Sequence, residues 1–180
     1  MKVIISPAKS LDFEKQLPTK LSTKPVFLSE ADKINSLLKI KSQKSIGDLM
    51  KISEKLAELN WQRNQVFNDN STKTRAAVFA FNGDVYNGLD AYSFSKEQIN
   101  TMQNQLFILS GLYGILKPLD VIKPYRLEMG TPLKIDTSKN LYDFWKNKIT
   151  EKLNSLVLND DLLVNLASKE YFDVINHKIL

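Results

Sequence analysis

The sequence predicts an α/β fold in which helices flank a mixed sheet, with α+β as the alternative. Three observations favour this class. Short apolar runs typical of buried strands occur at several points of the chain. Longer segments with apolar residues at helical spacing lie between these runs, and capping residues separate the two kinds of segment. The 180 residues suit one globular domain, so we expect a single domain over residues 1–180.

A strand and an extended connector come first. Lys2–Ile5 is a short apolar run of the kind that forms a buried strand, and Pro7 ends it. Residues 11–28 are polar and contain two prolines, which disfavour a helix because proline lacks the amide hydrogen. We therefore expect an extended connection there.

Residues 29–69 predict a block of three helices. Ser29, Ser45 and Ser53 each precede a run of helical character, and serine is a favoured residue at a helix N-cap. The spacing within the third run predicts an apolar side made of Leu56, Leu59 and Trp61.

The middle of the chain predicts a strand and two helices. Ala76–Phe81 is an apolar run of β-compatible composition, and the following Asn-Gly pair ends it. Asp84–Leu89 can then form a short helix. Ser95 and Gln98 have the spacing of a capping box, which predicts a helix through about Gln105.

The last third contains the strongest helical pattern. Leu106–Leu109 could end the preceding helix or form a strand, and residues 110–136 predict loops with short elements. Ser138–Leu158 predicts a long helix, Leu162–Leu166 a buried strand, and Ser168 the cap of a last helix. The apolar stripe of the long helix consists of Leu141, Phe144, Trp145, Ile149, Leu153 and Leu156.

Composition narrows the function classes. The formal net charge of +5 and the pI of about 9.2 favour phosphate-bearing partners, although the lysines alternate with acids as on an ordinary solvated surface. The chain has no cysteine, and its single histidine is His177, so we expect no metal and no cofactor. Since no apolar run has the length of a membrane span, we expect a cytoplasmic protein without a membrane partner.

Polar side chains in short loops after predicted strands are the first candidate site. Lys9 and Arg126 could hold a phosphate or a carboxylate, the arginine in a bidentate manner. Asp84 or Glu128 could act as an acid–base group, which makes these two the candidate catalytic residues. The alternative is that Arg126 pairs with one of these carboxylates in a purely structural ion network.

A glycine-rich turn is the second candidate site. In the segment Leu109–Pro118, Gly111 and Gly114 follow a possible helix and precede Lys117. This order has the outline of a helix–hairpin–helix, in which hairpin amides and a helix N-terminus bind a DNA phosphate. The alternative is a tight glycine turn that packs against the core.

Seven blocks in order along the chain resemble the YaaA-like peroxide stress protein family. They are Ile5–Leu11, Phe81–Leu89, Leu109–Gly114, Pro118–Asp120, Pro124–Gly130, Leu141–Trp145 and Asn165–Phe172. Members of that family are longer, with a further β-rich, basic segment after the position of Leu180. We therefore expect this chain to lack the family's C-terminal segment.

The resemblance implies a protein of the hydrogen peroxide stress response that limits iron-driven oxidative damage. It also implies an unusual α/β fold with a helix–hairpin–helix, and a basic cleft that binds double-stranded or structured DNA, with no obligate protein partner. Carried over to this sequence, the hairpin residues are Gly111, Gly114 and Lys117, and the cleft residues are Lys9 and Arg126.

We expect a binding protein rather than an enzyme. The alternative is an enzyme for a small anionic or nucleotide-like substrate, in which Lys9 and Arg126 clamp the anion and Asp84 or Glu128 transfers a proton. Direct iron binding is a third hypothesis, ranked last because the sequence contains no cluster of ligands.

Overall fold

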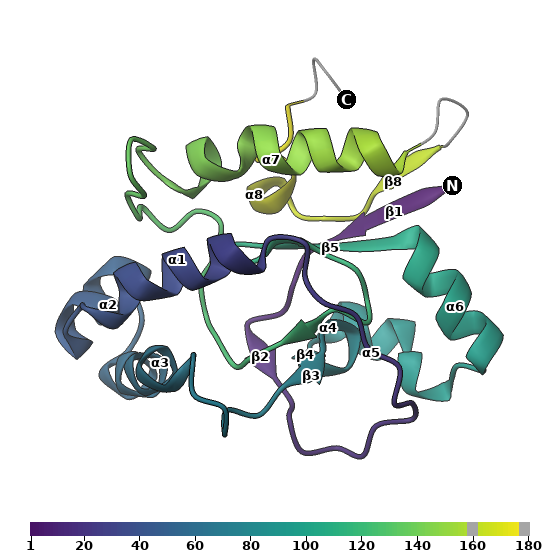
Figure 1. The fold of residues 1–180 in the computed structure, drawn as a ribbon, viewed down its shortest axis with the longest axis horizontal. Coiled ribbons are helices and arrows are strands. Elements are labelled where there is room, and N and C mark those ends of the chain that lie inside the picture. Colours follow the sequence, from purple (N-terminus) through teal and green to yellow (C-terminus); the bar gives the residue numbers. More distant parts are fainter. Residues whose placement is uncertain (158–161, 177–180) are drawn as a thin grey trace.

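The computed structural model describes residues 1–157 and 162–176 (Figure 1). A four-stranded mixed sheet lies at its centre with helices around it, which confirms the predicted α/β class. Helix α7 (Leu141–Leu156) runs along one side of the sheet, and α6 (Lys96–Gln105) lies at one end of the molecule in this view. No helix in the described part of the chain is long and apolar enough to cross a membrane.

The central sheet has the strand order β6-β5-β1-β8. Strand β1 (Lys2–Ile5) pairs in parallel with β5 (Leu106–Ser110) on one side and with β8 (Leu163–Asn165) on the other. Strand β6 (Gly114–Leu116) is antiparallel to β5. Because three of the strands run in the same direction, the segments that follow β1, β5 and β8 leave the sheet at one edge.

The predicted strands near both ends of the chain are confirmed, and the ambiguous segment after α6 is a strand. The expected burial of Leu162–Leu166 is wrong, because β8 is only partly buried and Leu162 and Leu166 are both 65% exposed. All residues of β5 are buried, because β5 lies between β1 and β6 within the sheet. An apolar run of this length suits either a helix end or an interior strand. The pairing with Ile4 and Ile5 of β1, which no local pattern contains, decides for the strand.

The long helix α7 is confirmed with slightly shorter bounds than predicted. Leu141, Trp145, Ile149 and Leu153 follow one another at intervals of one helical turn, and all four are fully buried. The side chain of Asn140, and not that of Ser138, caps the helix by accepting a hydrogen bond from the amide of Asp143 at 3.0 Å. A short final helix, α8, begins after Ser168 as predicted and spans Lys169–Phe172.

The helical block is confirmed as α1 (Leu28–Lys39), α2 (Gln43–Met50) and α3 (Glu54–Val66), but two of its caps differ. Helix α1 starts after Phe27 instead of Ser29. Ser42 caps α2 instead of Ser45, because its hydroxyl accepts the amide hydrogen of Ser45 itself. Ser53 is the N-cap of α3 as predicted.

The apolar side predicted for α3 is wrong. Leu56 and Leu59 are 37% and 40% exposed, whereas Ala57, Asn60 and Asn64 are buried. The side chain of Asn60 can be buried because its polar groups are bonded, whereas the buried Nδ2 atom of Asn64 has no hydrogen-bond partner among the described residues. The Asn60 amide donates to the carbonyl oxygen of Leu56, and the backbone carbonyl of Asn64 accepts a hydrogen bond from Asn35 of α1. The residue pattern alone does not predict that the asparagines are buried and the leucines exposed.

The predicted strand Ala76–Phe81 is interrupted by a helical turn. Strand β3 (Arg75–Ala76) leads into the single buried turn α4 (Ala77–Ala80), and strand β4 (Phe81–Asn82) follows. The first amides of α4 donate to backbone carbonyls of the segment 118–120, so tertiary contacts form the turn. The segment 118–120 leads directly into strand β7 (Val121–Ile122). This strand pairs with β3.

Beyond β4 the short helix α5 (Asp84–Leu89) is confirmed, and the 3₁₀ turn η1 (Ala91–Ser93) connects it to α6. Strand β2 (Ser10–Leu11) pairs with β4 in an antiparallel manner. This pairing places the loop after β1 beside the start of α5.

The predicted helix–hairpin–helix in Leu109–Pro118 is not confirmed, because strands flank the turn. Ser110 pairs with Gly114, so the segment is a β-hairpin between β5 and β6. Both glycines are buried, and Gly114 has a φ of 70°, a value that favours glycine. The segment is therefore a tight glycine turn packed against the core, which was the alternative prediction.

Ser95→Ala is expected to lower the free energy of unfolding by about 1 kcal/mol. Both halves of the capping box are formed: the Gln98 amide donates to the Ser95 hydroxyl, and the Ser95 amide donates to the Gln98 side chain at 2.7 Å. The matched control is Ser53→Ala, because Ser53 is an N-cap whose side chain makes no capping bond. Urea denaturation followed by circular dichroism measures both, and equal losses would contradict the assigned role of the Ser95 hydroxyl.

Candidate functional site

Three loops meet at the edge of the sheet where the parallel strands end. The loop after β1 supplies Ser6 and Lys9, and the segment after β8 supplies Ser168, whose amide donates to the Ser6 hydroxyl oxygen at 2.9 Å. The third loop carries Arg126 and Glu128. Ligands of α/β proteins commonly bind at this edge of a sheet.

The three loops enclose a cavity of about 210 Å³, which we call the edge cavity. It is lined by Ser6, Pro7, Ala8, Lys9, Tyr125, Arg126, Leu127, Glu128, Ser168, Glu170 and Tyr171.

One carboxylate in this cavity is shared by two cations. The Arg126 Nη2 atom lies 2.8 Å from the Glu128 Oε1 atom, and the Lys9 Nζ atom lies 3.5 Å from the same oxygen. Arg126 and Glu128 are largely buried, with side chains 16% and 17% exposed, whereas Lys9 is 70% exposed. The structural ion pair that the sequence left open therefore exists between Arg126 and Glu128, and a cavity lies beside it.

Arg126 has hydrogen-bonding capacity left over. Its Nε atom is buried and has no hydrogen-bond partner among the described residues. An unpaired buried donor is costly, and a bound acceptor would remove that cost. The guanidinium thus keeps one donor that Glu128 does not bond.

The guanidinium of Arg63, far from Arg126 in the sequence, lies close enough for the charge of Arg126 to affect its pKa. Burial lowers the pKa of Arg63, a residue of α3, and the positive charge of Arg126 lowers it further. The Arg63 side chain donates to the Asn60 side-chain oxygen at 3.3 Å, and no ion pair of Arg63 is formed within the described residues. Like charges held together in this way attract an anion.

Arg63 lines a wider hollow of about 520 Å³ that adjoins the edge cavity. Pro124, also in its wall, precedes the cavity residue Tyr125 directly, and Lys73 lies on the same hollow. We call Lys9, Arg63, Lys73 and Arg126 the basic surface. Acids are present beside it, since Lys73 forms an ion pair with Glu14.

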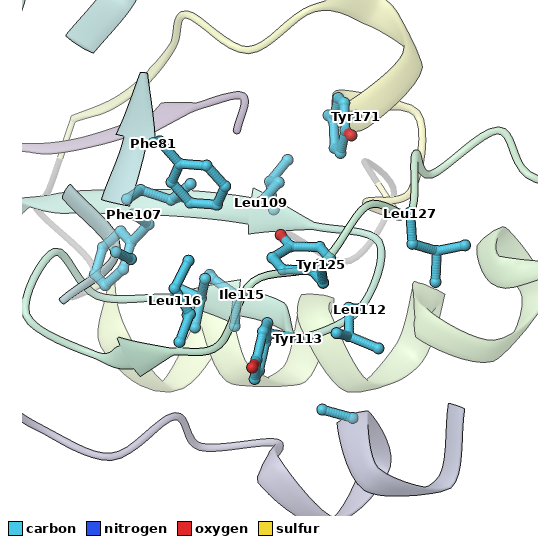
Figure 2. Close-up of a cluster of buried hydrophobic side chains, with 14 of the residues drawn as sticks. Phe81, Phe107, Leu109, Leu112, Tyr113, Ile115, Leu116, Tyr125, Leu127 and Tyr171 are labelled. Carbon is cyan, nitrogen blue, oxygen red and sulfur yellow. The ribbon is translucent and has the colours of Figure 1, made fainter. Parts of the chain in front are cut away.

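The floor of the edge cavity is aromatic and uncharged. Tyr125 and Tyr171 are 6% and 7% exposed, and Figure 2 shows Tyr125 among Leu109, Tyr113 and Leu127 in the buried cluster. Burial raises the pKa of both phenols well above the usual value, so both stay protonated at neutral pH. The Tyr125 hydroxyl is already engaged with the Ser110 hydroxyl at 2.7 Å.

The structure brings together three of the predicted site residues: Lys9, Arg126 and Glu128. Asp84 is exposed in the first turn of α5 and does not line the edge cavity, so it is not part of this group.

Lys117 lies on a different hollow, of about 310 Å³, which Lys24, Asp120 and Lys152 also line. The backbone amide of Lys117 donates to the Asp120 carboxylate at 2.8 Å, and burial raises the pKa of that carboxyl. The predicted set of phosphate-binding residues therefore falls on separate parts of the molecule.

Sequence reasoning missed Arg63 and Glu170. Arg63 lies in a polar helical segment without any distinguishing pattern, so only the fold reveals its closeness to Arg126. Glu170 stands within the block Asn165–Phe172 that carries the family resemblance, and this was an available signal. Its carboxylate accepts the amide hydrogen of Gly130 at 2.9 Å, which ties α8 to the loop of Glu128.

Metal-binding geometry is absent from the described residues: no three His, Cys, Asp or Glu side chains there are grouped so as to hold an ion. His177 lies outside the described residues. The alternative hypothesis of an enzyme for a small anion is still physically possible, because a cavity lies beside Arg126. Both carboxylates of that cavity are already bonded, Glu128 to the two cations and Glu170 to a backbone amide.

A family match and several relatives each cover the whole length of this chain. The family described as "Peroxide stress protein YaaA" matches residues 1–180. A UPF0246 protein of Flavobacterium psychrophilum is 54% identical over 182 residues, which cover 100% of this chain and 72% of the relative. A UPF0246 protein of Flavobacterium johnsoniae is 52% identical with the same coverage, and one of Idiomarina loihiensis is 50% identical over 100% of this chain and 71% of its own length.

Proposed function

The chain belongs to the YaaA peroxide stress protein family, and we propose that it serves this response by binding the phosphate backbone of DNA at the basic surface. Double-stranded or structured DNA is the proposed partner. The proposal includes a role in limiting iron-driven damage to that DNA, which the family resemblance implies.

The observation that carries the proposal is that Arg63 and Arg126, on two neighbouring hollows, are close enough for the charge of Arg126 to lower the pKa of Arg63 below the value set by burial. Arg63 of α3 lines the wider hollow and Arg126 lines the edge cavity, and the consecutive residues Pro124 and Tyr125 line one each. Arginine forms bidentate bonds with phosphate oxygens, so a phosphate between the two groups would relieve their repulsion and bond the free Arg126 donor. The formal net charge of +5 would assist the approach of a polyanion.

Contacts of this kind carry little sequence information, because phosphates are the same at every base pair. The proposal therefore implies similar affinity for unrelated sequences and a strong dependence on salt. It does not depend on the glycine turn of the β5–β6 hairpin, since that turn is buried.

Arg63→Gln and Arg126→Gln are each expected to weaken DNA binding for all sequences alike. Each lost phosphate contact should reduce the slope of log affinity against log salt concentration by about 0.9. Fluorescence anisotropy of labelled duplex and bubble DNA, titrated over a series of salt concentrations, measures affinity and slope together. Thermal denaturation of each variant checks that it is folded.

Two matched controls accompany these variants. Lys96→Gln removes an exposed charge from the start of α6, on the other side of the view in Figure 1 from α3, and should leave the slope unchanged. Lys117→Gln tests the hairpin assignment separately. A wild-type chain that fails to bind DNA at low salt would end the proposal, and a slope lowered only by Lys117→Gln would move the interface to the other hollow.

A further inference from the structure

The edge cavity has room for one small group. Its volume of about 210 Å³ lies below the range of roughly 300–1,000 Å³ that is typical of pockets for drug-sized ligands. A single ring system fits a space of this size, whereas a stretch of DNA backbone does not. The cavity therefore suits a ligand smaller than the DNA that the basic surface would bind.

The walls of the cavity suit a flat aromatic ring with polar edges. Tyr125, Leu127 and Tyr171 are buried and give it an apolar floor without charge. Its polar groups include both acceptors and donors: the carboxylates of Glu128 and Glu170 accept, and the Lys9 ammonium donates. A nucleobase has apolar faces and an edge that carries donors and acceptors, and it is recognised by both kinds of contact.

The position of the cavity relates it to the basic surface. Arg126 belongs to the wall of the edge cavity, and Arg63, whose charge it senses, lines the adjoining hollow. Within a nucleotide, a single sugar joins the base to its phosphate. A phosphate held by these two arginines would accordingly place its own base at the mouth of the cavity.

We propose that the edge cavity receives a nucleobase turned out of the DNA that lies on the basic surface. This inference rests on the proposed function and adds a site for one nucleotide to it. Because carboxylates accept hydrogen bonds from exocyclic amino groups, Glu128 and Glu170 favour a base that carries one, namely adenine, cytosine or guanine. Extrusion costs a few kcal/mol of stacking and pairing, which phosphate and cavity contacts must supply.

The test uses a duplex with one 2-aminopurine opposite thymine, because this amino-bearing base fluoresces more strongly when it leaves the stack. The 180-residue chain should raise its fluorescence several-fold. Ser168→Phe fills the cavity from an exposed position, and Ala8→Leu fills it from the side of β1. Asn100→Phe is the matched control, an equal addition at an exposed position of α6.

Both filling variants should abolish the fluorescence rise while the duplex stays bound in anisotropy measurements, and Asn100→Phe should preserve it. Permanganate reactivity of the opposite thymine gives a second readout, which is independent of any quenching within the cavity. The thymine should become reactive with the wild-type chain and not with the filled variants.

Other outcomes overturn the inference. A bound duplex without a fluorescence rise or thymine reactivity would remove it and leave the proposed function intact, whereas absence of DNA binding would remove both. An equal rise with the filled variants would place the extruded base elsewhere. Binding of free 2-aminopurine nucleoside monophosphate that Ser168→Phe abolishes, with no response from the duplex, would assign the cavity to a nucleotide from solution.

Discussion

Gly111→Ala is expected to lower the free energy of unfolding by about 3 kcal/mol or more. A β carbon at this position would lie deep inside van der Waals contact with the carbonyl oxygen of Leu127. It would also lie 3.0 Å from the carbonyl carbon of Leu127 and 3.1 Å from that of Glu128. Backbone atoms cannot rotate aside as a flexible side chain can, so the loop itself would have to move. The same loop carries Arg126, and DNA binding should fall together with stability.

The matched control is Gly88→Ala in helix α5, where an added β carbon meets no atom within 4 Å. Alanine has the higher helix propensity, so this variant should be unchanged or more stable by about 0.5–1 kcal/mol. Urea denaturation followed by circular dichroism compares the two substitutions. A Gly111→Ala protein as stable as the wild type would contradict the packing of the β5–β6 turn against residues 127–128.

Elements that depend on neighbouring residues could be predicted from the sequence. Helix α7 has buried residues at every turn from Leu141 to Leu153, and α6 begins with a complete capping box at Ser95 and Gln98. Strand β1 was recognisable as an apolar run ended by Pro7. In each case the pattern that defines the element lies within the element or next to it.

Elements that depend on distant partners could not be predicted. The turn α4 donates its first amides to the segment 118–120, and these bonds replace the expected strand in Ala76–Phe81. Gly111 and Gly114 follow an apolar run that could be helix or strand. Pairing of that run with β1 makes it a strand, and the expected helix–hairpin–helix then becomes a β-hairpin.

The candidate site was predictable to the extent that its residues follow strands. Lys9 lies in the short loop after β1, and Arg126 and Glu128 lie in a polar loop, so residue type and position marked all three. The contribution of Arg63 depends on how α3 packs, and the separation of Lys117 depends on the course of the β5–β6 hairpin. Neither arrangement has a local signature.

Trp145→Ala is expected to lower the free energy of unfolding by about 3–5 kcal/mol. Trp145 is fully buried in α7, and its ring lies 5.4 Å from that of Phe27 and 4.9 Å from that of Phe144. Its indole nitrogen donates to the carbonyl oxygen of Gly111 at 2.9 Å. The substitution removes a large apolar side chain and leaves that buried carbonyl without its partner.

Trp145→Phe separates the two losses, because phenylalanine restores most of the apolar volume but no donor. It should cost about 1–3 kcal/mol, the range for a buried polar group that loses its hydrogen bond. Thermal and urea denaturation measure both variants. If Trp145→Phe proved as damaging as Trp145→Ala, the packed volume of the ring would contribute little, and the indole hydrogen bond would account for the loss.

The same indole ring explains why position 114 requires glycine. A β carbon on Gly114 would lie 2.6 Å from the Cζ3 atom of Trp145, and the φ of 70° is unfavourable for any other L-residue except asparagine or aspartate. Gly114→Ala should therefore be costly in the wild type and cheaper in the Trp145→Ala background, where the ring is gone. The cost that remains there, about 1–2 kcal/mol, is the backbone conformation alone. Strictly additive losses in this double-mutant cycle would contradict direct contact between the two positions.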